Sequence, residues 1–471
     1  MKQKEGFRKY LPITFLIGAG FFTMGLMDPL YDSYVTIFLS RYIPFKWLVG
    51  ILMAIDNVLA ILLIPIVSAW SDRTRTKIGR RMPWIIILLP LSAITFSFIP
   101  YAAKNSLAAL IIILALLNLF KQSVRGPVIA LMPDIVPAEF RSQGNGVINT
   151  MGNIAAIVGT LFLARLMDVD TVLPIIGHTK DVLSFPAAGL LVILATLMLF
   201  LFVKEKNAPL HDSSENEEEK KVPFIQAMKT VLAGRKIEDE EKPDKSALFV
   251  LVSLFLWFLG YQGMLPYIAE YSIKHFGVST GQGAFAAGMV GIASALSAIP
   301  MGYAASKWGR KRMIRIALVV VASLCLAQFF LIEIAGILGL AEGQIKYLFW
   351  GLMFVFGIFW ICIIANSFPM LWQMAGFSHI GLYTGLYYTF SQGAAILAPF
   401  LAGLIIDFAG HRAVFVYCAC FFLLAWLMMG KVTRGEKYDK VELIFFKLYR
   451  AGLVLLYFNP KVCITSSPYL F

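Results

Sequence analysis

Twelve long apolar runs constrain the fold of this chain more than any other feature of its sequence. Each run has about 20 or more mostly apolar residues, the length that an α-helix needs to cross the hydrocarbon core of a bilayer. The runs fall into two groups of six: 11–40, 46–70, 84–103, 106–133, 145–167 and 183–203, and then 246–273, 281–305, 313–338, 346–374, 381–406 and 411–432. The sequence therefore predicts an all-α polytopic membrane protein with twelve transmembrane helices in two six-helix halves.

The composition requires lipid as a solvent for much of the surface. Of the 471 residues, 59% are hydrophobic and only 15% are charged, whereas about 25% of a soluble globular domain is charged. The net charge of +13 would by itself suit a nucleic-acid partner. The basic residues, however, lie in short loops between the apolar runs, as is typical of membrane topology. The expected partner is therefore the lipid bilayer, not nucleic acid.

The one long polar stretch divides the chain into domains. We predict an N-terminal bundle at 1–203, a charged linker at 204–245, a C-terminal bundle at 246–432 and a tail at 433–471. Within the linker, residues 222–237 suit either a short amphipathic helix on the membrane surface or a loosely ordered loop.

The placement of Lys and Arg predicts the orientation. The loops 71–83 and 306–312 are strongly basic, whereas the loop 168–182 is poor in Lys and Arg. Twelve spans place the two basic loops, both termini and the linker on one side, which the positive-inside rule assigns to the cytoplasm. We therefore expect a multi-pass protein of the cell membrane, functional as a monomer.

An internal repeat relates the two groups of runs. The segment 146–168 matches the segment 385–407 without a gap, at a constant offset of 239 residues, and both segments end in an aspartate, Asp168 and Asp407. These are the fifth and eleventh runs, so each run of the first half corresponds to the sixth run after it. Both aspartates are interpreted as interfacial repeats, not as substrate ligands. Parallel halves with a binding site between them are a known transporter plan.

The loop 71–83, with the sequence SDRTRTKIGRRMP, resembles the signature between helices 2 and 3 of the major facilitator superfamily, and SKWGRKR at 306–312 echoes it. The resemblance implies a conformational latch in which arginines hold helix ends and nearby acids. The alternative is simple positive-inside anchoring. The predicted latch residues are Asp72, Arg73, Gly79, Arg80, Arg81, Gly309, Arg310, Lys311 and Arg312.

A narrower resemblance is carried by the fourth and fifth runs. The segments 125–134 (RGPVIALMPD), 140–145 and 151–153 are similar to the glycoside–pentoside–hexuronide:cation symporters and the sucrose:proton symporters. This implies a secondary transporter of a sugar or glycoside that works by alternating access. The chain departs from the sucrose carriers at Ile129, where they have an arginine. Where melibiose-type carriers have cation-binding aspartates, it has Ala60, Ile64 and Arg125, so the coupling cation is expected to be H⁺, not sodium.

Ionisable residues inside the apolar runs are the candidates for coupling, because a charge inside a membrane is costly and usually functional. Asp28 and Asp32 are four residues apart and share a helix face, as do Lys121 and Arg125 in the fourth run. With Asp56 of the second run they form the predicted charge network. The alternative is a static cluster of ion pairs. Asp134, at the end of the fourth run, is expected to pair with the loop arginines instead.

Polar and aromatic residues of the runs suit the binding of a sugar, because aromatic rings stack on sugar rings and amides or phenols bond hydroxyl groups. Ordinary packing is the alternative for each of them. The candidate ligands are Asn57, Gln122, Asn149, Asn153, Trp257, Tyr261, Gln262, Trp360, Asn366, Tyr387, Tyr388 and Gln392.

Other functions fit the sequence less well. A hexuronide or other organic anion held by Lys121 and Arg125 is one alternative, and an efflux antiporter is another. A non-transporting receptor does not explain the intramembrane charges. The sequence has no phosphate-binding loop and no nucleophile motif, and its five cysteines lack metal-ligand spacing. An enzyme, a metal and a cofactor are therefore not expected.

Overall fold

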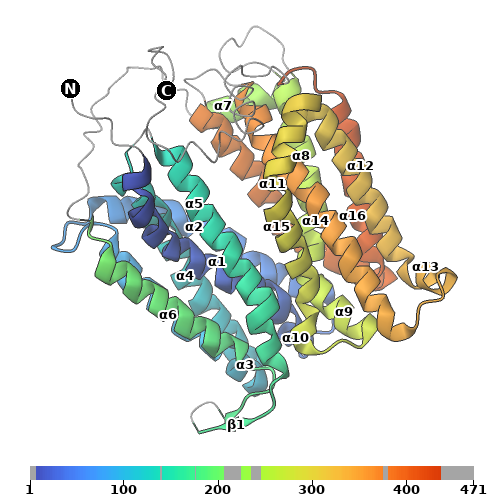
Figure 1. Ribbon diagram of the computed structural model, residues 1–471, viewed down its shortest axis with the longest axis horizontal. Coiled ribbons are helices and arrows are strands. Elements are labelled where there is room, and N and C mark those ends of the chain that lie inside the picture. Colours follow the sequence, from blue (N-terminus) through green and yellow to red (C-terminus); the bar gives the residue numbers. More distant parts are fainter. Residues whose placement is uncertain are drawn as a thin grey trace.

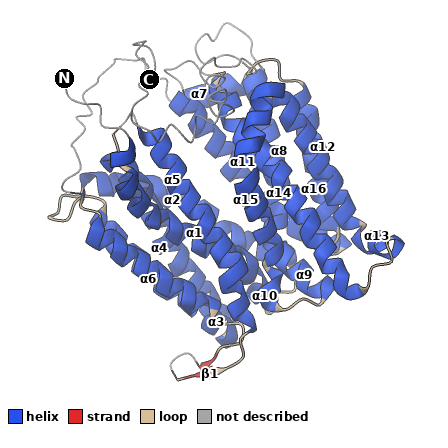
Figure 2. Cartoon of the chain, viewed as in Figure 1, coloured by secondary structure: helices blue, strands red, loops and turns tan. Residues whose placement is uncertain are grey.

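The computed structural model describes residues 7–137, 140–174, 177–205, 224–234, 245–374 and 380–435. Within these residues the protein is almost entirely helical, with one short antiparallel pair of strands, β1 (Val172–Leu173) and β2 (Gly177–His178) (Figure 2). In the described part of the chain, twelve helices are long and apolar enough to cross a membrane, and each overlaps one of the twelve predicted runs. The predicted fold class is confirmed.

The first half holds six spans (Figure 1). The fifth is irregular, since α5 passes into a π-helical segment, η3, and then a 3-10 segment, η4. The elements are α1 (Leu11–Ser40), α2 (Lys46–Arg73), α3 (Met82–Asn105), α4 (Leu107–Ile135), α5 (Arg141–Ile157), η3 (Val158–Phe162), η4 (Leu163–Asp168) and α6 (Ser184–Phe202).

The second half repeats this plan, preceded by the short helix α7 (Phe224–Leu232). Its seventh span is built from α8, η6 and α9, and its eighth from α10 and α11. The elements are α8 (Ser246–Met264), η6 (Leu265–Tyr267), α9 (Ile268–Phe276), α10 (Thr280–Gly283), α11 (Phe285–Trp308), α12 (Arg310–Phe329), α13 (Leu331–Ile337), α14 (Glu342–Trp372), α15 (Ile380–Ala409) and α16 (Ala413–Gly430).

The ninth span differs from its predicted bounds of 313–338. It begins three residues earlier, at Arg310, and ends at Phe329. A turn at Phe330 then starts the separate helix α13, which points away from the bundle (Figure 1). The apolar run continues through both helices, but Glu333 of α13 forms an ion pair with Arg412, at 3.1 Å between Oε1 and Nη1. Apolar composition alone cannot show that such a run ends its span early.

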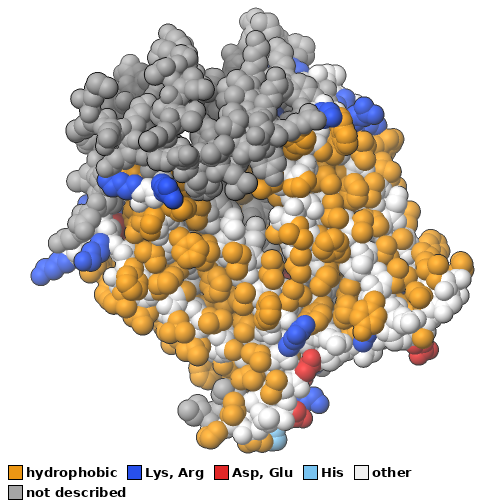
Figure 3. Space-filling model, viewed as in Figure 1, with side chains coloured by type: hydrophobic (Ala, Val, Ile, Leu, Met, Phe, Trp, Pro, Cys, Tyr) orange, Lys and Arg blue, Asp and Glu red, His pale blue; other side chains and the backbone are white. Residues whose placement is uncertain are grey.

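Many large apolar side chains face outward from the spans. Ile87, Ile112 and Ile299 are 57%, 58% and 63% exposed, and Figure 3 shows apolar side chains across the middle of one face. A soluble monomer rarely exposes a continuous apolar surface of this kind. The exposed residues therefore form the surface that contacts lipid.

The two ends of the helices differ in charge. We call the end with residues 74–81 and the start of α12 at Arg310 the basic end, and the opposite end, with residues 41–45, 169–174, 177–183 and 410–412, the far end. Gly79 and Gly309 lie in turns at the basic end with φ of 115° and 92°, a region that favours glycine. Both glycines therefore make tight turns at this end.

Two predicted segments lie mostly outside the described residues. The linker at 204–245 is described only at 204–205, 224–234 and 245, and the tail at 433–471 only at 433–435. The helix α7 confirms a helix within 222–237. The predicted domain boundaries stay predictions.

Candidate functional site

A polar cavity of about 170 Å³ lies between the two halves, midway along the helices. Helices α1, α2 and α4 line it from the first half, and α8, η6 and α15 from the second. The cavity brings together these predicted site residues: Asp28, Asp32, Asp56, Asn57, Arg125, Gln262 and Gln392. Its other lining residues, which the sequence analysis did not select, are Met53, Leu265, Pro266, Ala395 and Pro399.

Asp28 and Lys121 form the ion pair of this site. The Nζ atom of Lys121 lies 2.7 Å from Oδ1 of Asp28 and 4.9 Å from the centre of the Tyr31 ring. Lys121 is buried, whereas Asp28 is 35% exposed on the cavity side of the pair. The predicted meeting of an acidic face of α1 with a basic face of α4 is thus present for this pair.

Several acceptor atoms around the cavity have no protein donor. Oδ1 of Asp56 and Oε1 of Gln392 are buried and accept no hydrogen bond from the described residues. The same holds for Oε1 of Gln122, which neighbours Lys121 on α4 but is not among the residues that line the cavity. Burying a polar atom without a partner costs free energy. Such atoms in a cavity wall are suited to receive a proton or a hydroxyl group from a bound molecule.

Arg125 also lines the cavity. In the part of the chain that the structure describes, no carboxylate forms an ion pair with Arg125. No Lys or Arg side chain of that part forms one with Asp32 or Asp56. The charge network is therefore a single close pair with other charges around a shared cavity, not a closed cluster of ion pairs.

Most of the predicted aromatic ligands pack within the second half. Tyr261 stacks on Trp360 with ring centres 4.0 Å apart, and Tyr387 stacks on Phe368 at 3.6 Å. Trp257 is fully buried. None of these tryptophans and tyrosines is among the residues that line the cavity. Their role as substrate ligands stays a prediction.

The remaining predicted ligands also lie outside the cavity lining. Asn366 is buried and donates a hydrogen bond of 2.7 Å to the carbonyl oxygen of Cys362, one turn earlier in α14. Asn149, Asn153 and Tyr388 have exposed side chains. Their role as substrate ligands also stays a prediction.

The repeated aspartates join the two halves at the far end. Asp407, at the end of α15, accepts hydrogen bonds from the backbone N–H groups of Lys46 and Trp47 at 2.9 and 3.0 Å. Asp168, at the end of η4, accepts from the backbone of Gly281 at 2.9 Å and from the hydroxyl of Ser279 at 2.6 Å. Each carboxylate therefore caps the N-terminus of a helix in the opposite half, where negative charge is favourable. Both aspartates end their spans as predicted, but the contacts that they make between the halves were not predicted.

A buried ion pair strengthens the same contact. Nζ of Lys46, in the first half, lies 2.6 Å from Oε1 of Glu270, in the second, and both side chains are less than a tenth exposed. Lys274 and His411 also approach this oxygen, at 2.8 and 3.5 Å. The hydroxyl of Tyr267 lies 2.9 Å from the carbonyl oxygen of Lys46. We call Lys46, Asp168, Tyr267, Glu270 and Asp407 with their partners the far-end seal.

The sequence analysis missed the centre of this seal. Glu270 lies inside the predicted run 246–273, so the cost of an intramembrane charge marks it as clearly as it marks Asp28. Lys46 is the first residue of its run, and a lysine in that position is usually found at the membrane–water interface. The pairing of the two depends on the docking of the halves.

The predicted latch motif forms a dense network at the basic end. Arg80 and Arg81 both bind Asp134, at 2.7 Å from Nη2 of Arg80 and 2.9 Å from Nε of Arg81, and Arg81 also pairs with Asp72. Burial works to lower the pKa of the Arg80 guanidinium, but the hydrogen bond to Asp134 and the negative charges of Asp134, Asp72 and Glu205 together outweigh it, so the pKa is raised. The predicted pairing of Asp134 with loop arginines is confirmed.

Glu205 completes this network. Its carboxylate accepts hydrogen bonds from the backbone N–H groups of Arg80, Arg81 and Met82 at 2.9 to 3.1 Å, which caps the start of α3. The network thus ties together α2, α3, α4 and the end of α6, all within the first half. Arg73 and Arg312 are exposed, and Lys311 donates to the carbonyl oxygen of Val432. The action of the motif as a latch stays a prediction.

These features define a class of protein: a polytopic membrane protein whose two helical halves enclose a polar cavity and are sealed together at one end. The family model described as the Major Facilitator Superfamily matches residues 11–392 and again residues 274–463. The chain belongs to this superfamily and is a secondary transporter, a class that is generally not enzymatic. A search of curated proteins finds no match.

Solved structures share the fold at low sequence identity. A bacterial homologue of the human lysosomal transporter Spinster, inward-facing and occupied, is 14% identical with a TM-score of 0.65, over 91% of this chain and 97% of its own. A D-xylose–proton symporter is 13% identical with a TM-score of 0.64, over 91% and 99%. A nucleoside transporter is 10% identical with a TM-score of 0.67, over 89% and 100%. At these identities the likeness extends to the fold alone.

Proposed function

We propose that this protein is a proton-coupled symporter of a sugar or glycoside that works by alternating access. The observation that carries the proposal is the cavity between the halves, in which carboxylates of the first half face amide side chains of the second. A site at the interface of two repeated halves can be exposed to either side of the membrane when the halves rock.

The carboxylates supply the coupling. Asp28 is held by Lys121, whereas Asp32 and Asp56 line the cavity without an ion pair to a described residue. Desolvation and a nearby cation act in opposite directions on the affinity of a carboxylate for a proton. A motion that alters the water or the cation beside one of these groups therefore loads or releases a proton.

The polar groups around the cavity supply the binding site. Asn57, Gln262 and Gln392 each offer an amide that donates and accepts, which suits the hydroxyl groups of a sugar. The volume of about 170 Å³ is below the roughly 300–1,000 Å³ of sites for drug-sized ligands. A small polar solute is thus favoured over a bulky apolar one. The shared fold with a D-xylose–proton symporter is compatible with this class of substrate.

The positive-inside rule indicates the orientation, and the far-end seal indicates which end is closed. We infer that the basic end of the protein faces the cytoplasm. The state with a closed far end is then inward-facing. A cysteine introduced at Asp170, at the far end, should react with an impermeant reagent outside intact cells, and one at Lys77 should not. The reverse pattern contradicts this orientation.

Arg125 favours a second candidate. Its guanidinium lines the cavity without an ion pair to a described carboxylate, and arginine binds carboxylates in a bidentate manner. A hexuronide or another organic anion would satisfy this group, whereas a neutral glycoside would contact it only through hydroxyl oxygens.

Uptake into proteoliposomes tests both candidates. The purified protein is offered labelled glycosides and hexuronides under an imposed pH gradient or an imposed sodium gradient. We expect accumulation of a neutral glycoside that depends on the pH gradient. Asp→Asn at one or more of Asp28, Asp32 and Asp56 should abolish accumulation but preserve exchange of internal for external substrate, because exchange needs no net proton movement.

The matched control is Asp181→Asn, which removes a carboxylate that pairs with Arg41 at the far end, away from the cavity. It should accumulate substrate at the rate of the unmodified protein. Uptake that depends on sodium and not on pH, or full accumulation by all three cavity variants, contradicts the proposal. Transport of hexuronides alone, lost in Arg125→Gln, favours the second candidate.

A further inference from the structure

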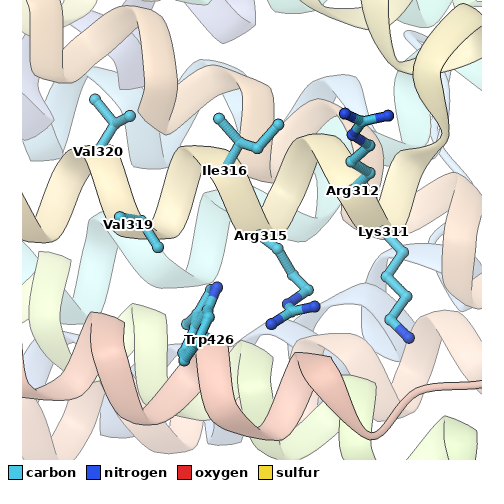
Figure 4. A pocket seen from close by; sticks show the side chains of 7 residues that line it. All are labelled: Lys311, Arg312, Arg315, Ile316, Val319, Val320 and Trp426. Atoms are coloured by element: carbon cyan, nitrogen blue, oxygen red, sulfur yellow. The ribbon is translucent and has the colours of Figure 1, made fainter.

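A second pocket lies outside the transport cavity, between α12 and α16 at the basic end (Figure 4). Its volume is about 560 Å³. Three basic side chains line one part of it: Lys311, Arg312 and Arg315. Apolar side chains of α12 and the indole of Trp426 on α16 line the rest. The site is therefore divided into a cationic part and an apolar part.

The order of these parts along α12 matches the profile of a membrane. The helix starts at Arg310 on the basic end, and at about 1.5 Å per residue Arg315 lies about 7.5 Å along its axis. Val319 and Val320 lie at least about 6 Å deeper. Ile316 and Val319 are exposed, as are Leu423 and Leu427 on α16. The pocket thus opens on the surface that contacts lipid, with its cations at the level of the headgroups.

Among the described residues, no anion pairs with the arginines of the pocket. No acidic side chain is among the lining residues, and the described carboxylates form no ion pair with Arg312 or Arg315. The guanidinium of Arg315 lies 4.7 Å from the ring of Trp426, and its buried Nε atom has no hydrogen-bond partner in the described part of the chain. An unsatisfied buried donor carries a cost that a bound anion removes. Guanidinium groups are especially suited to phosphate.

We propose that this pocket binds an anionic phospholipid of the leaflet at the basic end. The phosphate contacts Arg312 and Arg315, and an acyl chain lies along Val319 and Val320 beside the indole of Trp426. Basic pockets between transmembrane helices are suited to anionic headgroups. A free phosphate ion would use the cationic part only and leave the apolar part empty, so the two-part lining favours a lipid.

Lipid binding to the full-length purified protein tests the proposal. Its thermal stability and native mass spectrum are followed during titration with phosphatidylglycerol, with phosphatidylcholine of the same acyl chains, and with inorganic phosphate. We expect phosphatidylglycerol to bind and stabilise, and the other two to have little effect. Arg315→Gln should weaken the binding of phosphatidylglycerol about fivefold, as expected for the loss of one basic residue near a membrane surface.

The control is Lys307→Gln, which removes an exposed positive charge from the same end outside the pocket and should bind as the unmodified protein does. Arg312→Gln and Trp426→Leu, on different helices, test the site if Arg315→Gln does not fold. An equal effect of phosphatidylcholine or of inorganic phosphate overturns the proposal. So does an equal loss in Lys307→Gln, which would indicate diffuse surface charge, or unchanged binding in all the pocket variants.

Discussion

At the scale of single residues, Lys121 is the best-enclosed charge of the transport site. It is 4% exposed, with the carboxylate of Asp28 at 2.7 Å and the ring of Tyr31 over its ammonium group. The hydroxyl of Tyr31 in turn accepts a hydrogen bond of 3.1 Å from Asn118. The lysine is therefore enclosed on several sides, whereas Asp28 is partly exposed and lines the cavity.

This enclosure predicts an asymmetric effect of mutations on stability. Asp28→Asn leaves a buried ammonium without its counter-ion, and breaking a buried pair in this way costs about 3–5 kcal/mol. Because Asp28 is 35% exposed, we expect a loss near the lower limit. The double variant Asp28→Asn/Lys121→Met should recover most of it, since no charge is then stranded. Unfolding of the purified proteins in detergent measures the differences.

Asp181→Asn is again the control, because its partner Arg41 is 39% exposed and an exposed pair contributes about 0–1 kcal/mol. If Asp28→Asn is as stable as the unmodified protein, or if the double variant is no more stable than the single one, the pair is not the anchor described here.

At the scale of elements, hydropathy and helical spacing account for most of what the sequence predicted. The apolar runs located the twelve spans because a bilayer imposes length and composition on each helix separately. The four-residue spacing placed Asp28 and Asp32 on one face of α1, and Lys121 and Arg125 on one face of α4, for a similarly local reason. The 3-10 and π segments, the early end of α12 and the β1–β2 hairpin depend on local contacts that hydropathy does not record.

The candidate site was predictable only for residues whose position depends on one six-helix half alone. The carboxylates and Arg125 of the first half line the cavity as expected, and Arg80 and Arg81 bind Asp134. The choice of second-half residues fared differently: Gln262 and Gln392 line the cavity, but the aromatic candidates pack among themselves. Which face of α8 or α14 meets the other half is decided by docking, and a single sequence does not record it.

Two glycines determine how closely α2 and α15 approach at the far end. A Cβ atom on Gly50 would lie 2.2 Å from the carbonyl oxygen of Pro399, and one on Gly403 would lie 2.4 Å from that of Lys46. Both obstacles are backbone atoms, which cannot move aside as a side chain can. Any larger residue at either position must therefore separate the two halves.

We predict that Gly50→Ala opens the far end, although alanine favours helix formation by about 1 kcal/mol over glycine. Spin labels on cysteines replacing the exposed His178 and Glu342, one in each half, report the separation of the halves in a protein lacking Cys420 and Cys463. The distance distribution should shift to longer values. Gly302→Ala, where a Cβ atom meets nothing within 4 Å, should leave it unchanged. An unchanged distribution in Gly50→Ala refutes the role given to this contact.

At the scale of the whole molecule, the sequence repeat appears as a pair of equivalent contacts. Asp168 of the fifth span caps the helix that starts the eighth, and Asp407 of the eleventh span caps the second. The two contacts lie on different helix pairs, yet one rocking motion of the halves breaks both. The buried pair of Lys46 and Glu270 belongs to the second contact. The repeat therefore gives the far-end seal two similar helix caps, one made by Asp168 and one by Asp407.

This arrangement predicts additive effects on one conformational equilibrium. Replacing Asp168 or Asp407 by Asn removes a negative charge from a helix N-terminus. It also replaces one of the two carboxylate oxygens that accept hydrogen bonds by an NH2 group, which only donates. Loss of a capping interaction costs about 0.5–2 kcal/mol, and both aspartates are exposed at the edge of the seal, so we expect the lower part of this range. Each variant should then raise the ratio of far-end-open to far-end-closed molecules about threefold, measured with the labels at His178 and Glu342.

The double variant Asp168→Asn/Asp407→Asn should raise the ratio about ninefold, because two separate contacts that bias the same two-state equilibrium add in free energy. Asp170→Asn removes a charge two residues from the first aspartate, outside the seal, and should have no effect. A double variant no more open than either single one would mean that one contact alone holds the far end closed. The other contact would then contribute nothing to closure, and the repeat in the sequence would have no counterpart in the free energy of opening.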